Sequence, residues 1–256
     1  MPIRVSVIAP LFNEEQGIPR LAEKLARLRE QLGPKYELEC VLVDDGSRDR
    51  TLEVVERCFR NTPQIVKAAH DRNRGLGAAM RTGFRNATGS IVCTIDADCT
   101  FDPLELPKLL TALEEGNGDI ATGSPYHPRG GVENVVPSRL FLSQGASKLY
   151  RLICPGKLYS YTSLMRAYRR HIVERVSFES DGFLAVTEIL LRALNQGYRV
   201  VEVPTVLRRR ATGVSKMNVA RNILAHLVLA SRVLIWRFLP PRPLASGLHR
   251  KQNVNR

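Results

Sequence analysis

The strongest constraint on the fold is a regular alternation between Arg4 and Gly123, where short runs rich in β-branched residues are separated by longer stretches of helical periodicity. Parallel strands need long crossover connections, usually helices, so this spacing is typical of βα units. It predicts an α/β fold with a mainly parallel sheet flanked by helices. We expect strands at 4–9, 37–43, 64–69, 91–95 and 119–122, and helices at 15–32, 49–60, 75–87 and 104–115.

The second half of the chain has a less regular pattern. Residues 124–137 are rich in Gly, Pro and polar residues, which is typical either of an active-site flap or of an ordinary surface connection. Beyond them we expect helices at 138–153, 182–195 and 217–239, a strand at 162–168, and short extended segments at 199–203 and 205–208.

The composition excludes a wholly disordered chain, because 44% of the 256 residues are hydrophobic and 25% are charged. The length suits one large α/β domain or one domain with an appendage, and we favour the second. The net charge of +13 is uneven, because residues 204–256 hold eleven Lys or Arg and no Asp or Glu. A basic tail can meet nucleic acid, an anionic membrane or an acidic partner.

The five cysteines indicate neither a disulfide framework nor a zinc site. They are odd in number, widely separated and without a CxxC pair: Cys40, Cys58, Cys93, Cys99 and Cys154. Buried thiols in a reducing compartment are the simpler interpretation. The first strand begins almost at the N-terminus, with no basic and apolar leader before it. We therefore expect a cytoplasmic protein.

The last helix is amphipathic and basic. Arg221, Arg232 and Arg237 interrupt its apolar residues, so it does not span a bilayer alone. Such a helix either lies in a lipid interface or packs its apolar face on its own domain. We expect one α/β domain at 1–215, an interfacial helix at 216–241 that binds an anionic membrane, and a disordered basic tail at 242–256. On a helical wheel Leu224, Leu227, Val228, Leu234 and Ile235 fall in the apolar half, and Asn222, His226 and the three arginines in the polar half.

Acidic residues follow several of the expected strands. Asp96 and Asp98 come directly after the strand at 91–95, Glu14 follows the first strand, and Asp44 and Asp45 end the second. Open parallel sheets bind ligands at the carboxyl ends of their strands. Paired carboxylates there are suited to Mg²⁺ or Mn²⁺, which would hold a diphosphate. Each acid taken alone is equally typical of a turn or a helix cap.

The ordered motifs carry a family resemblance. PLFNEE, VDDGSRDRT, RNRGLGAAMRTGFRNATG and DADCTFDP together resemble the nucleotide-sugar domain of family 2 inverting glycosyltransferases. YTSLMRAYR, the helix containing Glu188, and RRRATGVSK resemble the polyprenyl-phosphate (dolichol-phosphate) mannosyltransferase branch. The resemblance implies a GT-A-like nucleotide-binding fold, a donor such as GDP-mannose, a polyprenyl phosphate acceptor, and a peripheral location on the inner face of the membrane.

The resemblance also implies roles for individual residues. Asp96 and Asp98 are expected as metal ligands and catalytic residues, with Asp98 the more direct ligand and Thr100 a weak contributor. The donor-binding set is Pro10, Phe12, Glu14, Asp44 or Asp45, Arg74, Gly75 and Ala97. The residues expected at the acceptor phosphate and the reaction centre are Arg139, Ser143, Arg210, Ser215 and Lys216.

Three positions depart from the branch and leave the sugar and the acceptor open. Ser160 stands where an Asp is usual, Leu164 where a Gly is usual, and Pro125 where an Arg often follows Gly-Ser. The alternatives are a transferase acting on a glycan, a glycolipid or a small metabolite, and a non-catalytic binding protein. Beyond Trp236 and Phe238 the tail lacks interleaved aromatic residues that stack on bases, which argues against nucleic-acid binding. The glycine-rich dinucleotide fingerprint is absent after the first strand, which speaks against NAD or FAD.

Overall fold

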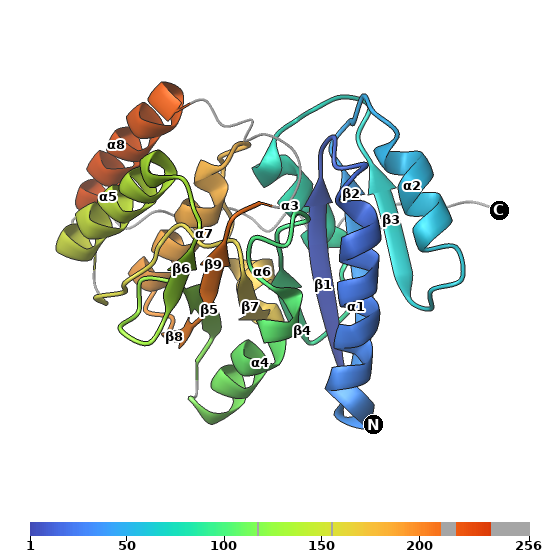
Figure 1. Cartoon of the computed structure of the whole chain (residues 1–256). Helices are drawn as coiled ribbons and strands as arrows, with labels where there is room; N and C mark the ends of the chain where they lie inside the picture. Colours follow the sequence, from blue (N-terminus) through green and yellow to red (C-terminus); the bar gives the residue numbers. More distant parts are fainter. Residues whose placement is uncertain (117, 155, 211–218, 237–256) are drawn as a thin grey trace.

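The computed structural model describes residues 1–116, 118–154, 156–210 and 219–236, and of residues 138, 139 and 219–221 it describes the backbone alone. Its centre is a seven-stranded sheet in which β7 alone runs antiparallel to its neighbours (Figure 1). In spatial order the strands are β3 (Ile65–Ala69), β2 (Tyr36–Asp44), β1 (Ile3–Leu11), β4 (Ile91–Thr94), β7 (Arg166–Arg169), β5 (Ile120–Ser124) and β8 (Val200–Pro204).

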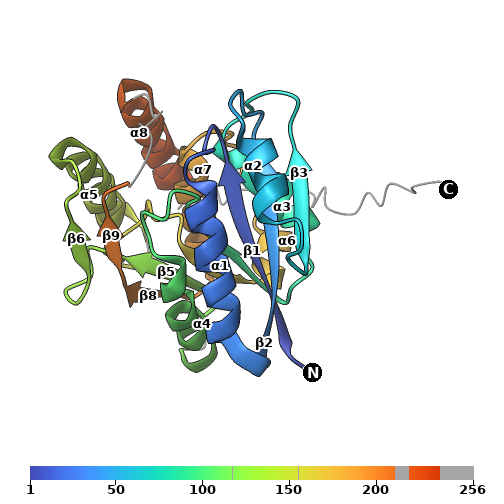
Figure 2. The same cartoon turned by 45° about the vertical axis from the view of Figure 1, so that its right-hand side comes forward.

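Helices cover both faces of this sheet. One face packs on α1 (Ile18–Leu32), α2 (Thr51–Cys58) and α4 (Leu106–Glu115), and the other on α3 (Leu76–Asn86), α6 (Arg170–Arg175) and α7 (Leu184–Asn195). Two short 3₁₀ turns, Gly33–Lys35 and Pro103–Glu105, precede β2 and α4. Beyond α7, α5 (Pro137–Ile153) and α8 (Val219–Trp236) lie side by side at the end of the sheet away from β3 (Figures 1 and 2).

The sequence pattern explains these elements locally. In α1 the buried residues recur at helical spacing, the N-terminal turn carries a proline, and the helix ends at Gly33 with a φ of 58°, which favours glycine. In β1, Val5, Val7 and Ala9 face the core beneath α1 and α4, whereas Ile8 faces the opposite core beside α3. Both faces of β1 are buried, as is typical of a parallel sheet.

A second, two-stranded sheet pairs β6 (Gly131–Glu133) with β9 (Val206–Arg208) in parallel. The segment 124–137, expected as a flap or a surface connection, therefore contains a strand. This pairing fixes the segment against the chain that leaves β8, because Gly131 N also donates to Thr205 O at 3.1 Å. The loop after β5 and the segment before Arg210 are thus held side by side.

The expected α/β fold with a mainly parallel sheet is confirmed, and the structure differs from the prediction in the details of a few later elements. β7 begins at Arg166 rather than 162, and it runs antiparallel. Just before β7, Leu164 O accepts from the hydroxyl of Thr94 on β4, and Met165 O accepts from the N–H of Gly123 on β5. The sequence pattern also missed α6 and β6.

In the part of the chain that the structure describes, none of the helices has the length and the apolar composition needed to cross a membrane. The basic tail at 242–256, and residues 216–218 and 237–241 of the expected interfacial helix, lie outside the described residues.

Candidate active site

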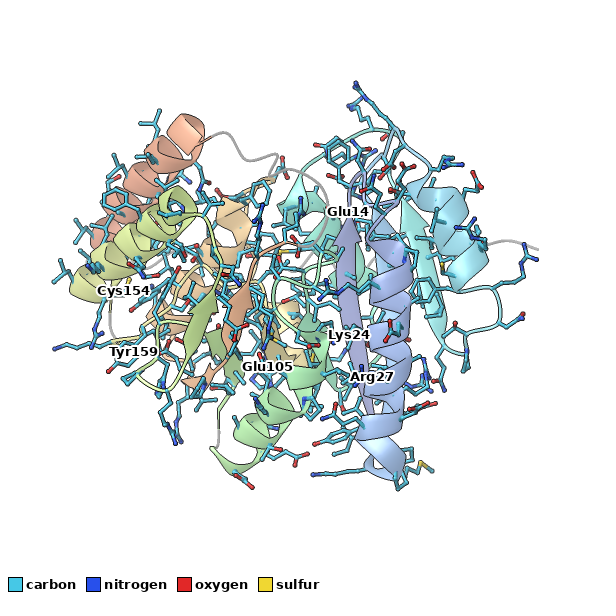
Figure 3. The ribbon with its side chains drawn as sticks, in the orientation of Figure 1. Glu14, Lys24, Arg27, Glu105, Cys154 and Tyr159 are labelled. Atoms are coloured by element: carbon cyan, nitrogen blue, oxygen red, sulfur yellow. The ribbon has the colours of Figure 1, made fainter. Side chains whose placement is uncertain are left out.

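The order of the strands reverses beside β1, because β2 and β3 extend the sheet on one side and β4 on the other. Such a switch point leaves a crevice at the carboxyl ends of the strands. Glu14 lies above the end of β1 (Figure 3), and Asp96 and Asp98 follow β4. The fold therefore brings together acids that are more than 80 residues apart in the sequence.

The loop after β1 is fixed to the loop after β2. Asn13 has a φ of 52°, an uncommon conformation for a residue other than glycine. Its N–H donates to Ser47 Oγ at 2.8 Å, its Oδ1 accepts from Arg48 N at 2.7 Å, and Glu14 N donates to Thr51 Oγ1 at 2.8 Å. These bonds set the position of Phe12 and Glu14, two of the residues expected to bind the donor.

Asp44 and Asp45 are buried, and both accept hydrogen bonds from the protein itself. Asp44 accepts from the hydroxyl and the N–H of Ser47. Asp45 accepts from Arg74 N at 2.9 Å and Gly75 N at 2.7 Å, and it lies 2.7 Å from His70 Nδ1. Asp45 therefore holds the loop before α3. A nucleobase contact for either acid stays a prediction.

The turn that leads into α3 does not present its amides as the sequence suggested. The N–H groups of Arg74 and Gly75 donate to Asp45, and those of Gly77 and Ala78 to Asp181 O. The Arg74 guanidinium pairs with Asp71 on the surface. In the described structure these N–H groups therefore have protein partners, and a donor contact of Arg74 or Gly75 stays a prediction.

Asp98, Glu14 and Arg210 form the charged centre of the crevice. Arg210 Nε donates to Asp98 Oδ2 at 2.6 Å and Nη2 to Glu14 Oε1 at 2.8 Å, and the two carboxylate side chains are only 7% and 9% exposed. Burial works to lower the pKa of Arg210, but Asp98, Glu14 and Asp96 outweigh it and raise that pKa above its ordinary value. Arg210 thus joins an expected metal ligand to an expected nucleoside contact.

The metal-ligand expectation can be tested against the donor set. Among the described residues there is no group of three or more His, Cys, Asp or Glu side chains arranged to hold a metal ion. Asp96 and Asp98 offer carboxylate oxygens, and Thr100 Oγ1 is buried without a hydrogen-bond partner in the described structure. Mg²⁺ is commonly bound by one or two carboxylates together with substrate phosphates. The residues fit that kind of site.

The expected acceptor residues are only partly described. Arg139 lies on α5, where its backbone alone is described, and Ser215 and Lys216 lie outside the described residues. Ser143 Oγ lies 2.6 Å from Thr162 Oγ1. Glu188 is buried away from the crevice, and it accepts from Arg192 Nε at 2.7 Å and from the N–H groups of residues 179 and 180. Its pKa is lowered, since these bonds outweigh the effect of burial.

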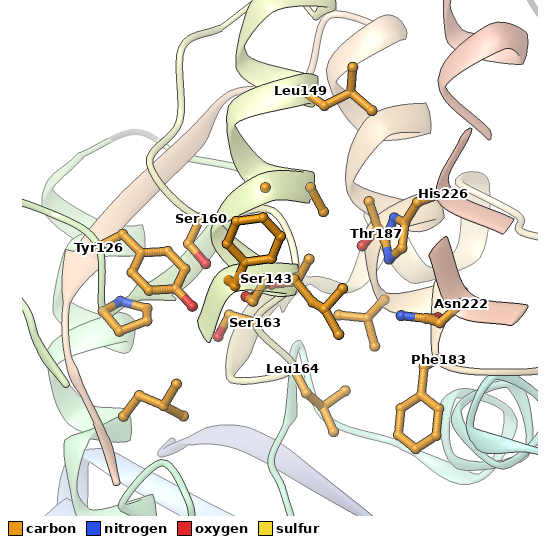
Figure 4. Close-up of a pocket in the computed structure, with 18 of the residues that line it drawn as sticks. Tyr126, Ser143, Leu149, Ser160, Ser163, Leu164, Phe183, Thr187, Asn222 and His226 are labelled. Carbon is orange, nitrogen blue, oxygen red and sulfur yellow. Dashed lines mark hydrogen bonds between the residues drawn. The ribbon is translucent and has the colours of Figure 1, made fainter. Parts of the chain in front are cut away.

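A cavity of about 390 Å³ extends from Asp96 to the inner sides of α5, α7 and α8. Figure 4 shows hydroxyl side chains gathered on one side of it, with Asn222, His226, Thr187 and Phe183 on the other. The three departures from the family pattern, Pro125, Ser160 and Leu164, all line this cavity. The sequence reasoning missed Tyr126 and Ser163, which line it too, since nothing local distinguishes them from loop residues.

The two faces of α8 differ from the sequence expectation in one respect. His226, assigned to the polar half, is buried, and its Nδ1 lies 3.0 Å from the hydroxyl of Tyr150 on α5. Burial lowers the pKa of His226 to about 4, so the ring is neutral at pH 7. Leu229, Val233 and Trp236 are buried, and the apolar half named from the sequence, Leu224, Leu227, Val228, Leu234 and Ile235, is exposed.

Comparison with known proteins finds a matching family model and curated relatives. A model described as Glycosyl transferase family 2 matches residues 6–177. Polyprenol monophosphomannose synthase of Mycolicibacterium smegmatis is 34% identical over 222 residues, which cover 84% of this chain and 81% of the relative. Dolichol-phosphate mannosyltransferase of Pyrococcus furiosus is 34% identical over 236 residues, 91% of this chain, but only 64% of that relative.

Similar solved structures have the same fold. Glucosyl-3-phosphoglycerate synthase from Mycobacterium tuberculosis, in complex with Mn²⁺, UDP-glucose and phosphoglyceric acid, gives a TM-score of 0.68 at 19% identity, covering 89% of this chain and 79% of that one. The same protein with Mg²⁺ and UDP gives 0.68 at 18% identity with the same coverage. At this identity the likeness concerns the fold alone, and it confirms the GT-A-like architecture.

Proposed function

The chain belongs to glycosyl transferase family 2, and from this premise we propose that it moves mannose from GDP-mannose to a polyprenyl phosphate at a membrane surface. The protein is a glycosyltransferase; the donor, the acceptor and the location are the proposal. The two relatives, whose names include polyprenol monophosphomannose synthase and dolichol-phosphate mannosyltransferase, support the sugar and the acceptor.

The observation that carries the proposal is the cavity that connects Asp96 with the space between α5 and α8. Its walls there are mainly apolar, with contributions from Ala146, Leu149, Val186 and Leu227. An isoprenoid chain is apolar and long, so it would lose contact with water in such a space. A purely hydrophilic acceptor would gain nothing from these walls.

The crevice residues would stabilise the negative charges of the departing diphosphate and of the acceptor phosphate. A divalent cation held by Asp96 and Asp98 would stabilise the negative charge that develops on the departing diphosphate. The acceptor phosphate is already an anion at neutral pH, so attack on the anomeric carbon requires alignment more than a general base. Arg210, already in the crevice beside Asp98 and Glu14, would hold that anion.

The direct test is transfer. Purified protein is incubated with labelled GDP-mannose, Mn²⁺ or Mg²⁺, and a polyprenyl phosphate, and the product is extracted into organic solvent. We expect a labelled lipid that is not formed when the polyprenyl phosphate is omitted. A parallel series with UDP-glucose, glycans, glycolipids and small metabolites identifies a different donor or acceptor. Label that enters only a water-soluble product would refute the lipid acceptor.

Membrane binding is a separate part of the proposal. Leu224 and Ile235 on α8 are 64% and 55% exposed, and Phe141 and Leu152 on α5 are also exposed. Such neighbouring apolar side chains on paired helices are suited to a lipid interface. With its net charge of +13, the protein would favour the anionic, cytoplasmic leaflet.

Substitution tests this better than truncation, because removing α8 would expose the buried Leu229, Val233 and Trp236. The double variant Leu224→Asn, Ile235→Asn should sediment less with anionic liposomes than the unchanged protein. Leu52→Asn is the matched control, since Leu52 is 46% exposed on the distant α2. Equal sedimentation of the double variant and the control would contradict a docking role for α8.

A further inference from the structure

The cavity next to Asp96 has one wall with unusual chemistry. Ser160 and Ser163, only 1% and 4% exposed, line it together with Thr162 and Tyr126. Figure 4 shows the hydroxyls of Ser160, Ser163 and Tyr126 gathered on the same side. Ser163 Oγ has no hydrogen-bond partner in the described structure. A buried hydroxyl without a partner costs free energy, so this wall is suited to a polar ligand.

The charge of the wall limits what that ligand can be. Among the described residues that line the cavity, Asp96 carries a charge and there is no Lys or Arg. A phosphate or carboxylate at these hydroxyls would lie near the Asp96 carboxylate and would meet no Lys or Arg side chain among the described lining residues. A neutral polyol both donates and accepts hydrogen bonds, as hydroxyl side chains do. The wall therefore matches an uncharged sugar.

The loop that carries these serines is held from beneath by two charged side chains. Glu202 on β8 accepts from Ser160 N at 2.9 Å and from Tyr159 N at 2.8 Å. Arg166 on β7 is fully buried, and its Nη2 donates to Tyr161 O at 2.8 Å while its Nε donates to Thr122 Oγ1 at 3.2 Å. Thr122 on β5 lies opposite both Arg166 and Glu202 in the sheet register.

The buried charge of Arg166 in this clamp has a cost in folding stability. A fully buried guanidinium that donates to neutral oxygens, as Arg166 does in the described structure, adds little stability, because its desolvation is expensive. A second support comes from Tyr159, whose ring lies 4.4 Å below the Arg151 guanidinium and 5.5 Å from the ring of His127. Together these contacts fix the backbone of residues 159–161 against the sheet. Rigid placement is what a ligand-binding wall requires.

We propose that residues 159–163 form the floor on which the transferred sugar rests, with the hydroxyls of Ser160 and Ser163 bonding an uncharged hexose and with Glu202 and Arg166 as positioning residues. This inference rests on the proposed use of a nucleotide-sugar donor. It does not depend on which acceptor receives the sugar. It also gives a role to Ser160, one of the positions where the chain departs from its family.

The first experiment separates the sugar from the nucleotide. Calorimetric titrations with Mn²⁺ compare GDP with GDP-mannose, and UDP with UDP-glucose, on the unchanged protein and on Ser160→Ala, Ser163→Ala and the double variant. Each hydroxyl removed should weaken nucleotide-sugar binding by roughly 3- to 10-fold and leave nucleotide binding unchanged. Ser90→Ala is the matched control, because Ser90 is exposed at the start of β4, away from the cavity.

Two outcomes would overturn the sugar floor. One is an unchanged affinity of the double variant for the nucleotide sugar that the unchanged protein binds. The other is a tighter binding of UDP-glucuronate than of UDP-glucose, which would show that the wall takes an anionic sugar. A protein that transfers no sugar to polyprenyl phosphate but shows the selective loss would refute the proposed acceptor and support the floor.

The second experiment tests positioning. Glu202→Ala should weaken nucleotide-sugar binding by about tenfold, with nucleotide affinity unchanged. Glu202→Gln should restore most of the loss, because its amide oxygen still accepts from the two N–H groups. Thermal melting of both variants shows whether they fold. A parallel fall in nucleotide and nucleotide-sugar affinity, or a failure of Glu202→Gln to rescue a folded protein, would overturn the positioning role.

Discussion

The crevice at the ends of β1 and β4 and the cavity under α5 and α8 meet at Asp96, but they differ in the charge of the side chains that line them. The crevice pairs charges, since Arg210 bridges Asp98 and Glu14. The cavity is lined by hydroxyls and apolar groups, with a neutral His226. On the proposed function, the ionic parts of the substrates would bind in the crevice and the uncharged parts in the cavity.

The comparison also separates function from stability. On the proposed function a charge in the crevice would act on substrate, and its removal should alter turnover with little effect on folding. The groups between α5 and α8 hold two helices together, and changes there should alter stability first. Each of the following variants tests one side of this division.

The largest effect should come from Asp98→Asn. The amide keeps an oxygen that can accept from Thr100 N, now 3.0 Å from Asp98 Oδ1, but loses the charge that would hold the cation. We expect kcat to fall by about 100- to 1000-fold with a melting temperature close to that of the unchanged protein. Asp102→Asn, outside the crevice and paired with Lys24, is the control. A near-normal kcat would remove Asp98 from the mechanism.

The next effect concerns His226 and the pH. Its folded-state pKa of about 4 lies below the ordinary 6.5, so the unfolded chain binds more protons between these values. The contribution of the neutral His226 ring to the free energy of unfolding is fully present above pH 6.5. It is lost as the pH falls toward 4, and the loss is on the order of 2–3 kcal/mol. Urea unfolding at several pH values measures it. His226→Gln should flatten this part of the profile, and an unchanged slope would contradict the assignment.

A smaller change is expected for Arg210→Gln. Hydrogen bonds to charged groups contribute about 1.5–3 kcal/mol, so the loss of the guanidinium should lower kcat/KM for the acceptor by about 10- to 150-fold. The neighbouring Arg209→Gln is the control, because the Arg209 side chain is exposed. Equal rates for the two variants would place Arg210 outside the reaction and would weaken the contrast between crevice and cavity.

The smallest effect should be that of Tyr150→Phe. The Tyr150 hydroxyl lies 3.0 Å from His226 Nδ1 and donates to His226 O at 3.1 Å. Deleting it should cost about 1 kcal/mol of unfolding free energy and leave nucleotide binding unchanged. Denaturant unfolding and calorimetry measure the two quantities. A loss of nucleotide affinity in a stable variant would show that the two regions are coupled.

The sequence predicts the βα units and the acidic strand ends because these signals are local. An apolar run followed by Asp96-Ala97-Asp98 predicts a buried strand that ends at the acids, and this prediction needs no other part of the chain. The sugar floor is different, because it depends on Glu202 reaching residues some 40 positions earlier in the chain. Arg166 inside a strand was the one local signal, since a charged residue is seldom placed in a central strand without a partner.

The remaining misses have the same cause. β6 is short and polar, and it forms because β9 lies beside it, which no local pattern indicates. The Asp45 carboxylate accepts from the N–H groups of Arg74 and Gly75, about 30 residues later in the chain. The sequence alone does not show that these N–H groups have a protein partner. The sequence also divided α8 into two halves without showing that the helix would bury a third side against α5 and α7.

Because of that third side, α8 both lines the cavity and presents apolar side chains to the outside. Ile223, His226 and Leu227 line the cavity, while Leu224 and Ile235 face outward. One helix thickness, about 10 Å, therefore separates whatever rests against the outside from the interior. On the proposed function, lipid at the outer side of α8 would lie about one helix diameter from the cavity. The diameter of α8 would then limit how far an acceptor headgroup has to reach from the lipid to the cavity.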